Sequence, residues 1–258
     1  MNHDHLAKPV APDATFRAFR LLNDPDLSVH ASSRGRVDRR ALVAVQGERL
    51  EDKLLRALVE RRALPAKEVW ESFEVAARAR STVRRATVVD LCCGHGLAGL
   101  LIAAFDRTVE NLWLVDERRP GNYERVVAAV ADVAPWVPSK VRWLEAPLKR
   151  ALPLLPAGAG ILAVHACGVR SDRAVDAAIA GGGPLVMVPC CYEGTAQTAP
   201  IALRESLGIV DAADIDRTYR LERAGFSVRW SSLPRAVTPM NRVIVAAPPG
   251  ALKTPHVD

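Results

Sequence analysis

The chain has 258 residues, of which 49% are hydrophobic, and a formal net charge of +6. This composition permits a sizeable buried core and excludes a chain that is disordered throughout. No apolar stretch approaches the roughly 18 to 20 residues of a membrane helix, and the N-terminus carries His, Asp and Pro where a signal peptide would be apolar. Five cysteines, including two adjacent pairs, suit a reducing compartment. We expect a cytoplasmic protein without a membrane partner.

Positive charge is concentrated in the first third of the chain. Residues 1–86 carry 17 basic and 12 acidic side chains, whereas the remainder carries 18 and 17. This bias allows the N-terminal region to bind RNA or another polyanion, and the arginine-rich residues 32–42 are candidates for phosphate contact. Two plainer explanations stay open: arginine usage that reflects the base composition of the gene, and a solvated charged loop at residues 32–42.

The first third of the chain has the pattern of helices. Leu50, Leu54 and Leu58 recur on one helical face, and Pro65 follows as a stop. Helices are expected at Phe16–Leu22, Gln46–Ala63 and Lys67–Arg80. We predict that residues 1–81 form a small, basic helical region and that residues 82–258 form a second domain.

From residue 86 onward, short apolar runs rich in β-branched residues alternate with helical segments. This alternation indicates a mostly parallel sheet that is covered on both faces. Strands are expected at Thr87–Cys93, Asn111–Asp116, Val141–Glu145, Gly160–Cys167, Leu185–Cys191, Phe226–Leu233 and Arg242–Ala247. Helices are expected at Leu97–Arg107, Asn122–Ala134, Pro147–Leu155, Ser171–Ala180, Ala199–Leu207 and Asp211–Ala224. We predict an α/β fold with a Rossmann-like, seven-stranded, mostly parallel sheet whose last two strands form an antiparallel pair at one edge.

The stretch TVVDLCCGHGLAGLLIAA carries the most information about function. A strand ends near Asp90, a tight loop with Gly94 and Gly96 follows, and an apolar helix starts near Leu97. Glycines in such a loop let the backbone approach a ligand and leave amides free at the helix start. Twenty residues after Gly96 the next strand ends in Asp116, where a carboxylate can accept hydrogen bonds from ribose hydroxyls. This combination predicts a nucleotide or nucleoside-cofactor site.

The acid at the end of the first strand favours S-adenosyl-L-methionine over NAD as the cofactor. A dinucleotide site has the spacing Gly-x-Gly-x-x-Gly and binds a pyrophosphate at the helix start. The carboxylate of Asp90 would repel that phosphate, whereas it attracts the ammonium and sulfonium groups of S-adenosyl-L-methionine. NAD stays the second candidate.

Residues 86–247 resemble a class I S-adenosylmethionine-dependent methyltransferase domain, whose first-strand motif is commonly D/E-x-G-x-G-x-G. The combination of DLCCGHG, VHACG and VPCCY, with the later run TPMNRVIVAAP, is more particular. It resembles the domain shared by acceptor-stem tRNA 2′-O-methyltransferases and by glutathione S-transferase C-terminal-domain-containing proteins. Two features depart from these relatives: Cys92 replaces the first glycine of the motif, and the zinc-finger spacing of the tRNA enzymes is missing.

The resemblance implies roles for individual residues. The implied contacts are Asp90, Cys92, Gly94 and Gly96 for the methionine end of the cofactor, Asp116 for the ribose, Glu145 and Ala146 for the adenine, and His165, Ala166 and Cys167 near the transferred methyl group. Three residues are candidate catalytic groups: His165, Cys167 and Cys191. If the acceptor is a hydroxyl, the imidazole or a thiolate is the candidate base.

All five cysteines fall at expected strand ends. Because the first, fourth and fifth strands are neighbours in methyltransferase sheets, we expect the thiols to gather at the carboxyl edge. Three interpretations stay open: small packing residues, a thiol that contacts substrate with His165 or His95 lowering its pKa, and metal ligands. We expect no metal site, because no Cys-x₂-Cys spacing exists and adjacent residues of a strand point to opposite faces.

These features predict an enzyme that transfers a methyl group from S-adenosyl-L-methionine to RNA. The narrower hypothesis is a tRNA substrate with a hydroxyl acceptor. No Asn/Asp-Pro-Pro-aromatic motif follows the fourth strand, which argues against methylation of exocyclic amines. The alternatives are a methyltransferase that acts on a small metabolite or a protein, and a non-catalytic protein that binds S-adenosyl-L-methionine or a nucleotide.

Overall fold

A computed structural model describes residues 11–37, 39–192 and 198–249. Seven strands form one sheet in the order β3-β2-β1-β4-β5-β7-β6. The strands are β1 Thr87–Leu91, β2 Asn111–Asp116, β3 Val141–Glu145, β4 Gly160–Val164, β5 Leu185–Val188, β6 Ser227–Ser232 and β7 Arg242–Ala247. The pairings among β1 to β5 are parallel, and β7 is antiparallel to both β5 and β6. The predicted fold class is therefore confirmed, including the antiparallel pair at the edge.

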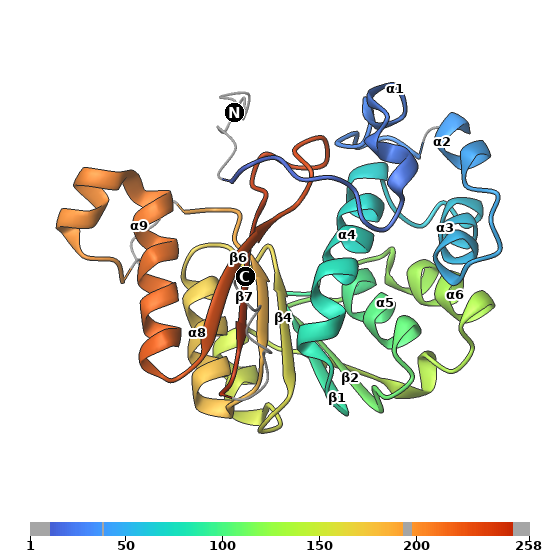
Figure 1. The fold of residues 1–258 in the computed structure, drawn as a ribbon. Coiled ribbons are helices and arrows are strands. Elements are labelled where there is room, and N and C mark those ends of the chain that lie inside the picture. Colours follow the sequence, from blue (N-terminus) through green and yellow to red (C-terminus); the bar gives the residue numbers. More distant parts are fainter. Residues whose placement is uncertain (1–10, 38, 193–197, 250–258) are drawn as a thin grey trace, which may run out of the picture.

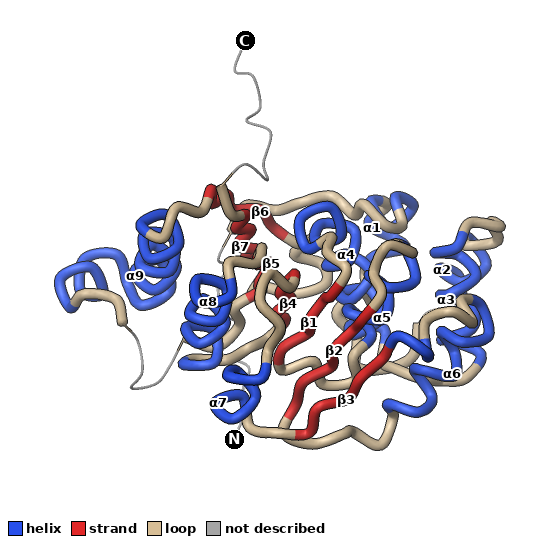
Figure 2. The backbone as a smooth tube through the Cα atoms, turned by 90° about the horizontal axis from the view of Figure 1, so that it is seen from below, coloured by secondary structure: helices blue, strands red, loops and turns tan. Residues whose placement is uncertain are grey.

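Helices cover both faces of this sheet (Figures 1 and 2). One face carries α3 Leu50–Glu60, α4 Ala66–Val83, α5 Leu97–Phe105 and α6 Tyr123–Val133, and the other carries α7 Leu148–Ala151, α8 Val169–Gly181 and α9 Ile201–Arg223. Successive side chains of a strand point alternately into two hydrophobic clusters, one on each face of the sheet. In β1, Val88 packs on the α4 side and Val89 packs on the α8 side. Burial on both faces explains why the central strands read as continuous apolar runs.

Several expected boundaries were wrong. The strands expected to reach Cys93, Cys167 and Cys191 end at Leu91, Val164 and Val188, so all five cysteines lie in loops. The two helices expected at 199–207 and 211–224, by contrast, are both present: they form the two parts of α9 and are separated by a kink at Gly208, which has a non-helical φ of 78°. The helix expected at 16–22 is replaced by a 3-10 turn at Arg20–Asn23 and a short helix α1 at Pro25–Ser28. The short helix α2, Arg39–Ala44, was not predicted from the sequence.

Helix α4 joins the N-terminal region to the sheet. Its buried Glu74 pairs with Arg78 one turn later and accepts the backbone N–H groups of Arg17 and Ala18. One hydrophobic cluster runs from Phe16 through α3 and α4 onto the strands. The domain boundary at residues 81 and 82 stays a prediction, and this shared core lies across it.

The N-terminal segment also lies beside the β6–β7 loop (Figure 1). The buried side chain of Asn241 accepts the N–H of Ala11 at 3.0 Å and donates to the carbonyls of Pro12 and Leu233, both at 3.1 Å. Because a buried amide without partners would be costly, these bonds stabilise the contact between the two ends of the described chain.

The close approach of α4 to β4 depends on Gly160. A Cβ atom at this position would overlap the carbonyl oxygen of Val83, the last residue of α4. We predict that Gly160→Ala lowers the free energy of unfolding by about 1–3 kcal/mol, because backbone atoms cannot rotate away as a side chain can.

Denaturant unfolding of the full chain measures this effect. Gly181→Ala is the matched control, since a Cβ at Gly181 has nothing within 4 Å and its φ is not positive; its free energy of unfolding should change by less than about 0.5 kcal/mol. Equal stabilities for the two variants would contradict the close packing of α4 on β4.

No helix of the described residues is both long enough and apolar enough to cross a membrane.

Candidate functional site

The loop between β1 and α5 is held by backbone hydrogen bonds and by two buried or half-buried acids. The chain turns at Cys92, Gly94 and Gly96, which have φ values of 55°, 53° and 74°. Gly96 begins α5, and a Cβ there would meet the Leu114 side chain at 2.7 Å. Glycine is favoured at positions 94 and 96 because a residue without a Cβ adopts a positive φ at little cost. Cys92 also has a positive φ, which is uncommon for a residue with a side chain.

Asp90 and Asp116 accept hydrogen bonds from backbone N–H groups of this loop and of the residues around it. The Asp90 carboxylate is buried and accepts the N–H of Gly99 at 3.0 Å. Asp116, at the end of β2, accepts the N–H of Gly94 at 2.7 Å and that of Glu117 at 2.6 Å. The two acids are therefore at the neighbouring strand ends where the sequence predicted them, and each has a backbone partner of its own.

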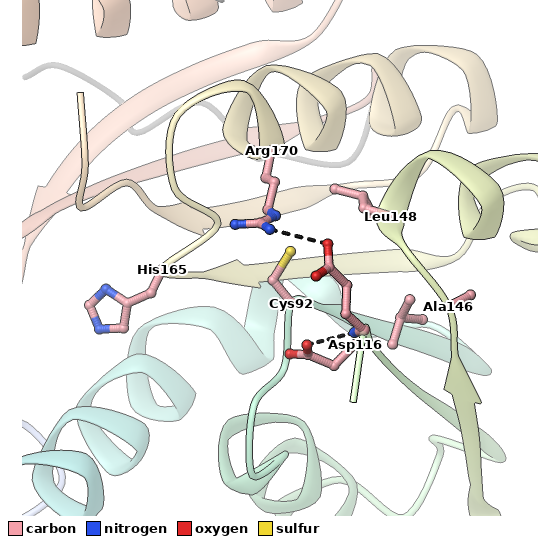
Figure 3. Close-up of a pocket in the computed structure, with 8 residues that line it drawn as sticks. Cys92, Asp116, Ala146, Leu148, His165 and Arg170 are labelled. Atoms are coloured by element: carbon pink, nitrogen blue, oxygen red, sulfur yellow. Dashed lines mark hydrogen bonds and ion pairs between the residues drawn. The ribbon is translucent and has the colours of Figure 1, made fainter. Parts of the chain in front are cut away.

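Two cavities open on either side of this loop and share Cys92 and His165 as walls. The first, here called the β2 cavity, has a volume of about 200 Å³. Besides the shared residues, its walls include Asp116, Glu117, Ala146, Leu148 and Arg170 (Figure 3). A carboxylate on one side and apolar side chains on the other suit a polar ring substituent and a flat apolar group.

The second cavity, here called the α4 cavity, has a volume of about 260 Å³. It lies between the first turns of α4 and the β1–α5 loop, and it is strongly charged. Its ionisable walls are Lys67, Glu68, Glu71, Asp90, His95 and His165. A cavity with both carboxylates and an ammonium group can bind a ligand that itself carries both signs of charge.

Glu71 is the central charged group of the α4 cavity. Its side chain is 5% exposed, and its Oε2 lies 2.9 Å from Lys67 Nζ and 2.8 Å from His165 Nε2. Burial raises the pKa of Glu71, but the contacts with His165 and Lys67 outweigh it, and the net pKa is lowered. The carboxylate is thus ionised and has one oxygen, Oε1, without a hydrogen-bond partner.

Burial shifts the pKa of two further groups in this cavity. It raises the pKa of Asp90 to about 7, although the Gly99 hydrogen bond acts in the opposite direction. It lowers the pKa of His95 to about 4, so this imidazole is neutral at pH 7 and accepts the N–H of Leu97 at 3.1 Å. His95 therefore supports the loop, and it is the ring of His165 that contacts the buried carboxylate.

Arg170 crosses the β2 cavity. Its guanidinium lies 3.1 Å from the Glu117 carboxylate, an ion pair that Figure 3 marks with a dashed line from Arg170. The His165 ring is turned away from Arg170 and Cys92, in keeping with its contact to Glu71. Both partners of the Arg170 pair are about half exposed, so the pair is weak and can open for a ligand.

Three of the cysteines gather at the carboxyl edge, as expected. The Sγ atoms of Cys167, Cys190 and Cys191 all lie within 4.8 Å of one another. Cys92 instead lines both cavities, and Cys93 lines the α4 cavity and packs against the α4-side core. The opposite-face argument against metal binding was wrong for Cys190 and Cys191, because β5 ends at Val188 and these residues follow it in a loop.

The remaining predicted residues divide between the cavity walls and the supporting structure. Ala146 lines the β2 cavity, whereas Glu145 is exposed and accepts only a long hydrogen bond, 3.4 Å, from the N–H of Arg119. The candidate bases Cys167 and Cys191 line neither cavity, and Ala166 is fully buried. The roles of all these residues in binding or catalysis stay predictions.

The charged cavity residues that lie outside the β1–α5 glycine loop were not predicted from the sequence. Lys67 and Glu71 lie four positions apart on α4, a spacing at which opposite charges meet on one helical face, and this was the available signal. Arg170 and Glu117 carried no such signal, because they are 53 positions apart in the chain and only the tertiary structure brings them together.

Comparison with protein-family models gives no match to the sequence, and a search of curated proteins gives none. The SAH-bound methyltransferase PaMTH1 of Podospora anserina has a similar structure, with a TM-score of 0.50 and 13% identity over 81% of this chain and 94% of that chain. The chain has the fold of class I S-adenosylmethionine-dependent methyltransferases.

Two further solved structures are more distant. An O-methyltransferase family protein from Burkholderia thailandensis matches with a TM-score of 0.42 and 14% identity, over 75% of this chain and 62% of that chain. The tRNA (uracil-54, C5)-methyltransferase of Pyrococcus abyssi matches with a TM-score of 0.41 and 11% identity, over 71% and 39%. The comparisons indicate no narrower family, so the resemblance to tRNA 2′-O-methyltransferases stays a prediction.

The raised pKa of Asp90 makes stability depend on pH. Between its ordinary pKa of 3.8 and its folded-state pKa of about 7, the folded chain holds a proton that the unfolded chain has lost. The contribution of Asp90 to the free energy of unfolding therefore falls as pH rises through this range, by an amount on the order of 4 kcal/mol.

Asp90→Asn removes this titration while its side-chain oxygen can still accept the Gly99 N–H. We expect the difference in free energy of unfolding between the variant and the natural chain to grow in favour of the variant from pH 4 to pH 8. Denaturant titrations across that range measure it. A difference that is constant with pH would mean that Asp90 does not titrate as described.

Proposed function

We propose that this protein is a methyltransferase that uses S-adenosyl-L-methionine as its methyl donor. The observation that carries the proposal is the pair of cavities that meet at Cys92 and His165 on the carboxyl edge of a methyltransferase-type sheet. An elongated ligand can lie across both, with a nucleoside in the β2 cavity and a charged tail in the α4 cavity. Ligands of open α/β sheets bind at this edge.

The α4 cavity suits the methionine end of that donor. An amino acid carries a carboxylate and an ammonium group, and the cavity offers Lys67 to the first and the carboxylates of Glu71 and Asp90 to the second. Glu71 Oε1 and Asp90 Oδ1 are buried and have no hydrogen-bond partner. Because an unsatisfied buried acceptor costs free energy, an ammonium donor between them would be stabilising.

The β2 cavity suits the adenosine end. Each Asp116 carboxylate oxygen accepts one backbone N–H, and a carboxylate oxygen can accept a second hydrogen bond, so ribose hydroxyls can join this arrangement. Ala146 and Leu148 provide an apolar wall for adenine. A pyrophosphate would instead lie beside Asp90 and Glu71, where like charges repel, which disfavours NAD.

The donor would supply a methyl group on a positively charged sulfur, so the protein's main task is to hold an acceptor in line with it. His165 lies where the two cavities meet, and its Nε2 faces the buried Glu71 carboxylate. A carboxylate in this position fixes the orientation of the ring. If the acceptor is a hydroxyl, His165 is the group that takes its proton and Glu71 positions the ring.

Binding of S-adenosyl-L-methionine to the full chain, measured by isothermal titration calorimetry, tests the cofactor. We expect Asp116→Ala to weaken the affinity at least tenfold, about 1.4 kcal/mol, because the ribose and the Gly94 amide lose their acceptor. Glu110→Ala is the matched control, since Glu110 is exposed and immediately precedes the opposite end of the same strand, and its affinity should equal that of the natural chain.

No measurable binding, or tighter binding of NAD, would overturn the cofactor assignment. Transfer of labelled methyl groups into separated RNA, metabolite and protein pools then identifies the acceptor class. Binding without transfer to any pool would support the non-catalytic alternative.

We propose RNA as the acceptor, supported by a cluster of arginines near the site. Arg34, Arg36, Arg62 and Arg125 line a cavity of about 280 Å³, and within the described part of the chain no acidic side chain forms an ion pair with any of the four. The backbone of residues 33 and 35 bonds to the first residues of α4, whose next turn lines the α4 cavity. Phosphates bound there would lie on the same edge of the sheet as the β2 and α4 cavities.

The RNA proposal predicts a steep dependence of binding on salt. We expect the affinity for unmodified bulk tRNA to fall strongly with ionic strength, and the double variant Arg62→Ala/Arg125→Ala to reduce the slope of log affinity against log salt by about 0.7–0.9 for each phosphate that it no longer neutralises. Fluorescence anisotropy measures both. Arg229→Ala, an exposed arginine on β6, should leave the slope unchanged; an equal reduction in this control would attribute binding to net charge alone, and absence of binding would favour a metabolite or protein acceptor.

A further inference from the structure

The three-thiol cluster of Cys167, Cys190 and Cys191 is unexplained by the proposed cofactor site. Cys167 lies in the loop between β4 and α8, and the other two follow β5. The Sγ atoms of Cys167 and Cys190 are 2.7 Å apart, and those of Cys190 and Cys191 are 3.6 Å apart. None of the three lines the β2 or α4 cavity, so the thiol cluster is separate from both cavities.

Backbone hydrogen bonds hold the two loops together at this point. The N–H of Gly168, next to Cys167, donates to the carbonyl of Cys191 at 2.9 Å. The N–H of His165 donates to the carbonyl of Val188 at 3.0 Å. The convergence of the thiols therefore follows from the pairing of β4 with β5 and from these two bonds, and it does not depend on the side chains alone.

The surroundings favour negative charge on sulfur. Cys167 lies just before the N-terminus of α8, a helix of 13 residues, where the helix dipole favours anions. Thiolate is the form in which cysteine binds metals.

We propose that Cys167, Cys190 and Cys191 bind one thiophilic divalent cation of the zinc class. Three thiolates match the preference of zinc for sulfur ligands at about 2.3 Å. Tetrahedral bonds of that length set the sulfur atoms about 3.8 Å apart, a spacing within the present 4.8 Å limit of the cluster. Binding releases the thiol protons of the three cysteines to solvent, and no oxidant is required.

Within the described part of the chain, the three thiols are the only ligands of this site. Among the described residues, no histidine, aspartate or glutamate joins the three thiols within 4.8 Å, and Cys191 is exposed. A water molecule or a thiol-containing ligand can therefore complete the coordination. A dithiol that only forms a disulfide would use two of the three sulfur atoms, whereas the metal site accounts for the third.

Zn²⁺ titration of the reduced full chain, kept in a phosphine reductant, tests the proposal. We expect one Zn²⁺ per chain by calorimetry, and a thiolate-to-metal charge-transfer absorption when Cd²⁺ is added instead. Cys167→Ser and Cys191→Ser should each weaken the Zn²⁺ affinity at least tenfold and reduce the Cd²⁺ absorption. Cys93→Ala removes a thiol that lies in the wall of the α4 cavity and does not belong to the cluster; it should leave the Zn²⁺ affinity and the Cd²⁺ absorption unchanged. Mg²⁺ as the titrant should show no binding.

Binding that is equal in all three variants, or absent from the natural chain, would overturn the proposal. Loss of two hydrogens in the intact mass, with no metal taken up, would replace it with a disulfide pair. Circular dichroism of each variant separates loss of ligands from loss of fold. Because the cluster lies outside both cavities, S-adenosyl-L-methionine binding measured on the same samples distinguishes failure of the metal site from failure of the proposed function.

Discussion

The packing of helix α4 against the sheet determines the geometry of the candidate site. The helix approaches β4 closely because Gly160 leaves room for the carbonyl of Val83, and its first turns extend over the β1–α5 loop. One face of the helix carries the buried Glu71 to His165, while Glu74 and Arg78 on the same helix anchor the N-terminal segment. A buried carboxylate requires such partners, because removing one would leave an uncompensated charge. The same helix thus links the core, the N-terminal region and the charged cavity.

Backbone strain is concentrated where chemistry is proposed. Among the described residues, the non-glycine residues with positive φ are Arg62, Cys92 and His165. Cys92 and His165 form the shared wall of the two cavities, and Arg62 lines the arginine cavity. Such conformations cost on the order of 1–3 kcal/mol each and persist only where the surrounding structure enforces them. Here the two turns directly follow β1 and β4, and they place Cys92 and His165 in the walls of both cavities.

Local sequence patterns predicted the sheet, the glycine loop and the two acids at the strand ends. Each of these depends on residues that are close together in the chain: apolar runs of strand length, glycines after a strand, and a fixed interval from Gly96 to Asp116. The cluster of thiols was also predictable, because strand order alone places the ends of β4 and β5 side by side. The predicted orientation of Cys190 and Cys191 was wrong because it assumed that β5 continued past Val188, and strand ends are set by turns that the apolar pattern does not mark.

By itself, the sequence determined the fold class and the position of the glycine loop between β1 and α5, since hydrophobic periodicity and glycine placement are properties of neighbouring residues. Only the tertiary structure decided which charged groups face that loop. Glu71 is about 20 residues ahead of Asp90 and nearly 100 ahead of His165 in the chain, and Arg170 and Glu117 belong to different halves of the sheet. Their meeting depends on how helices α4 and α8 pack across the strands, and packing angles follow from the shapes of buried side chains over the whole core.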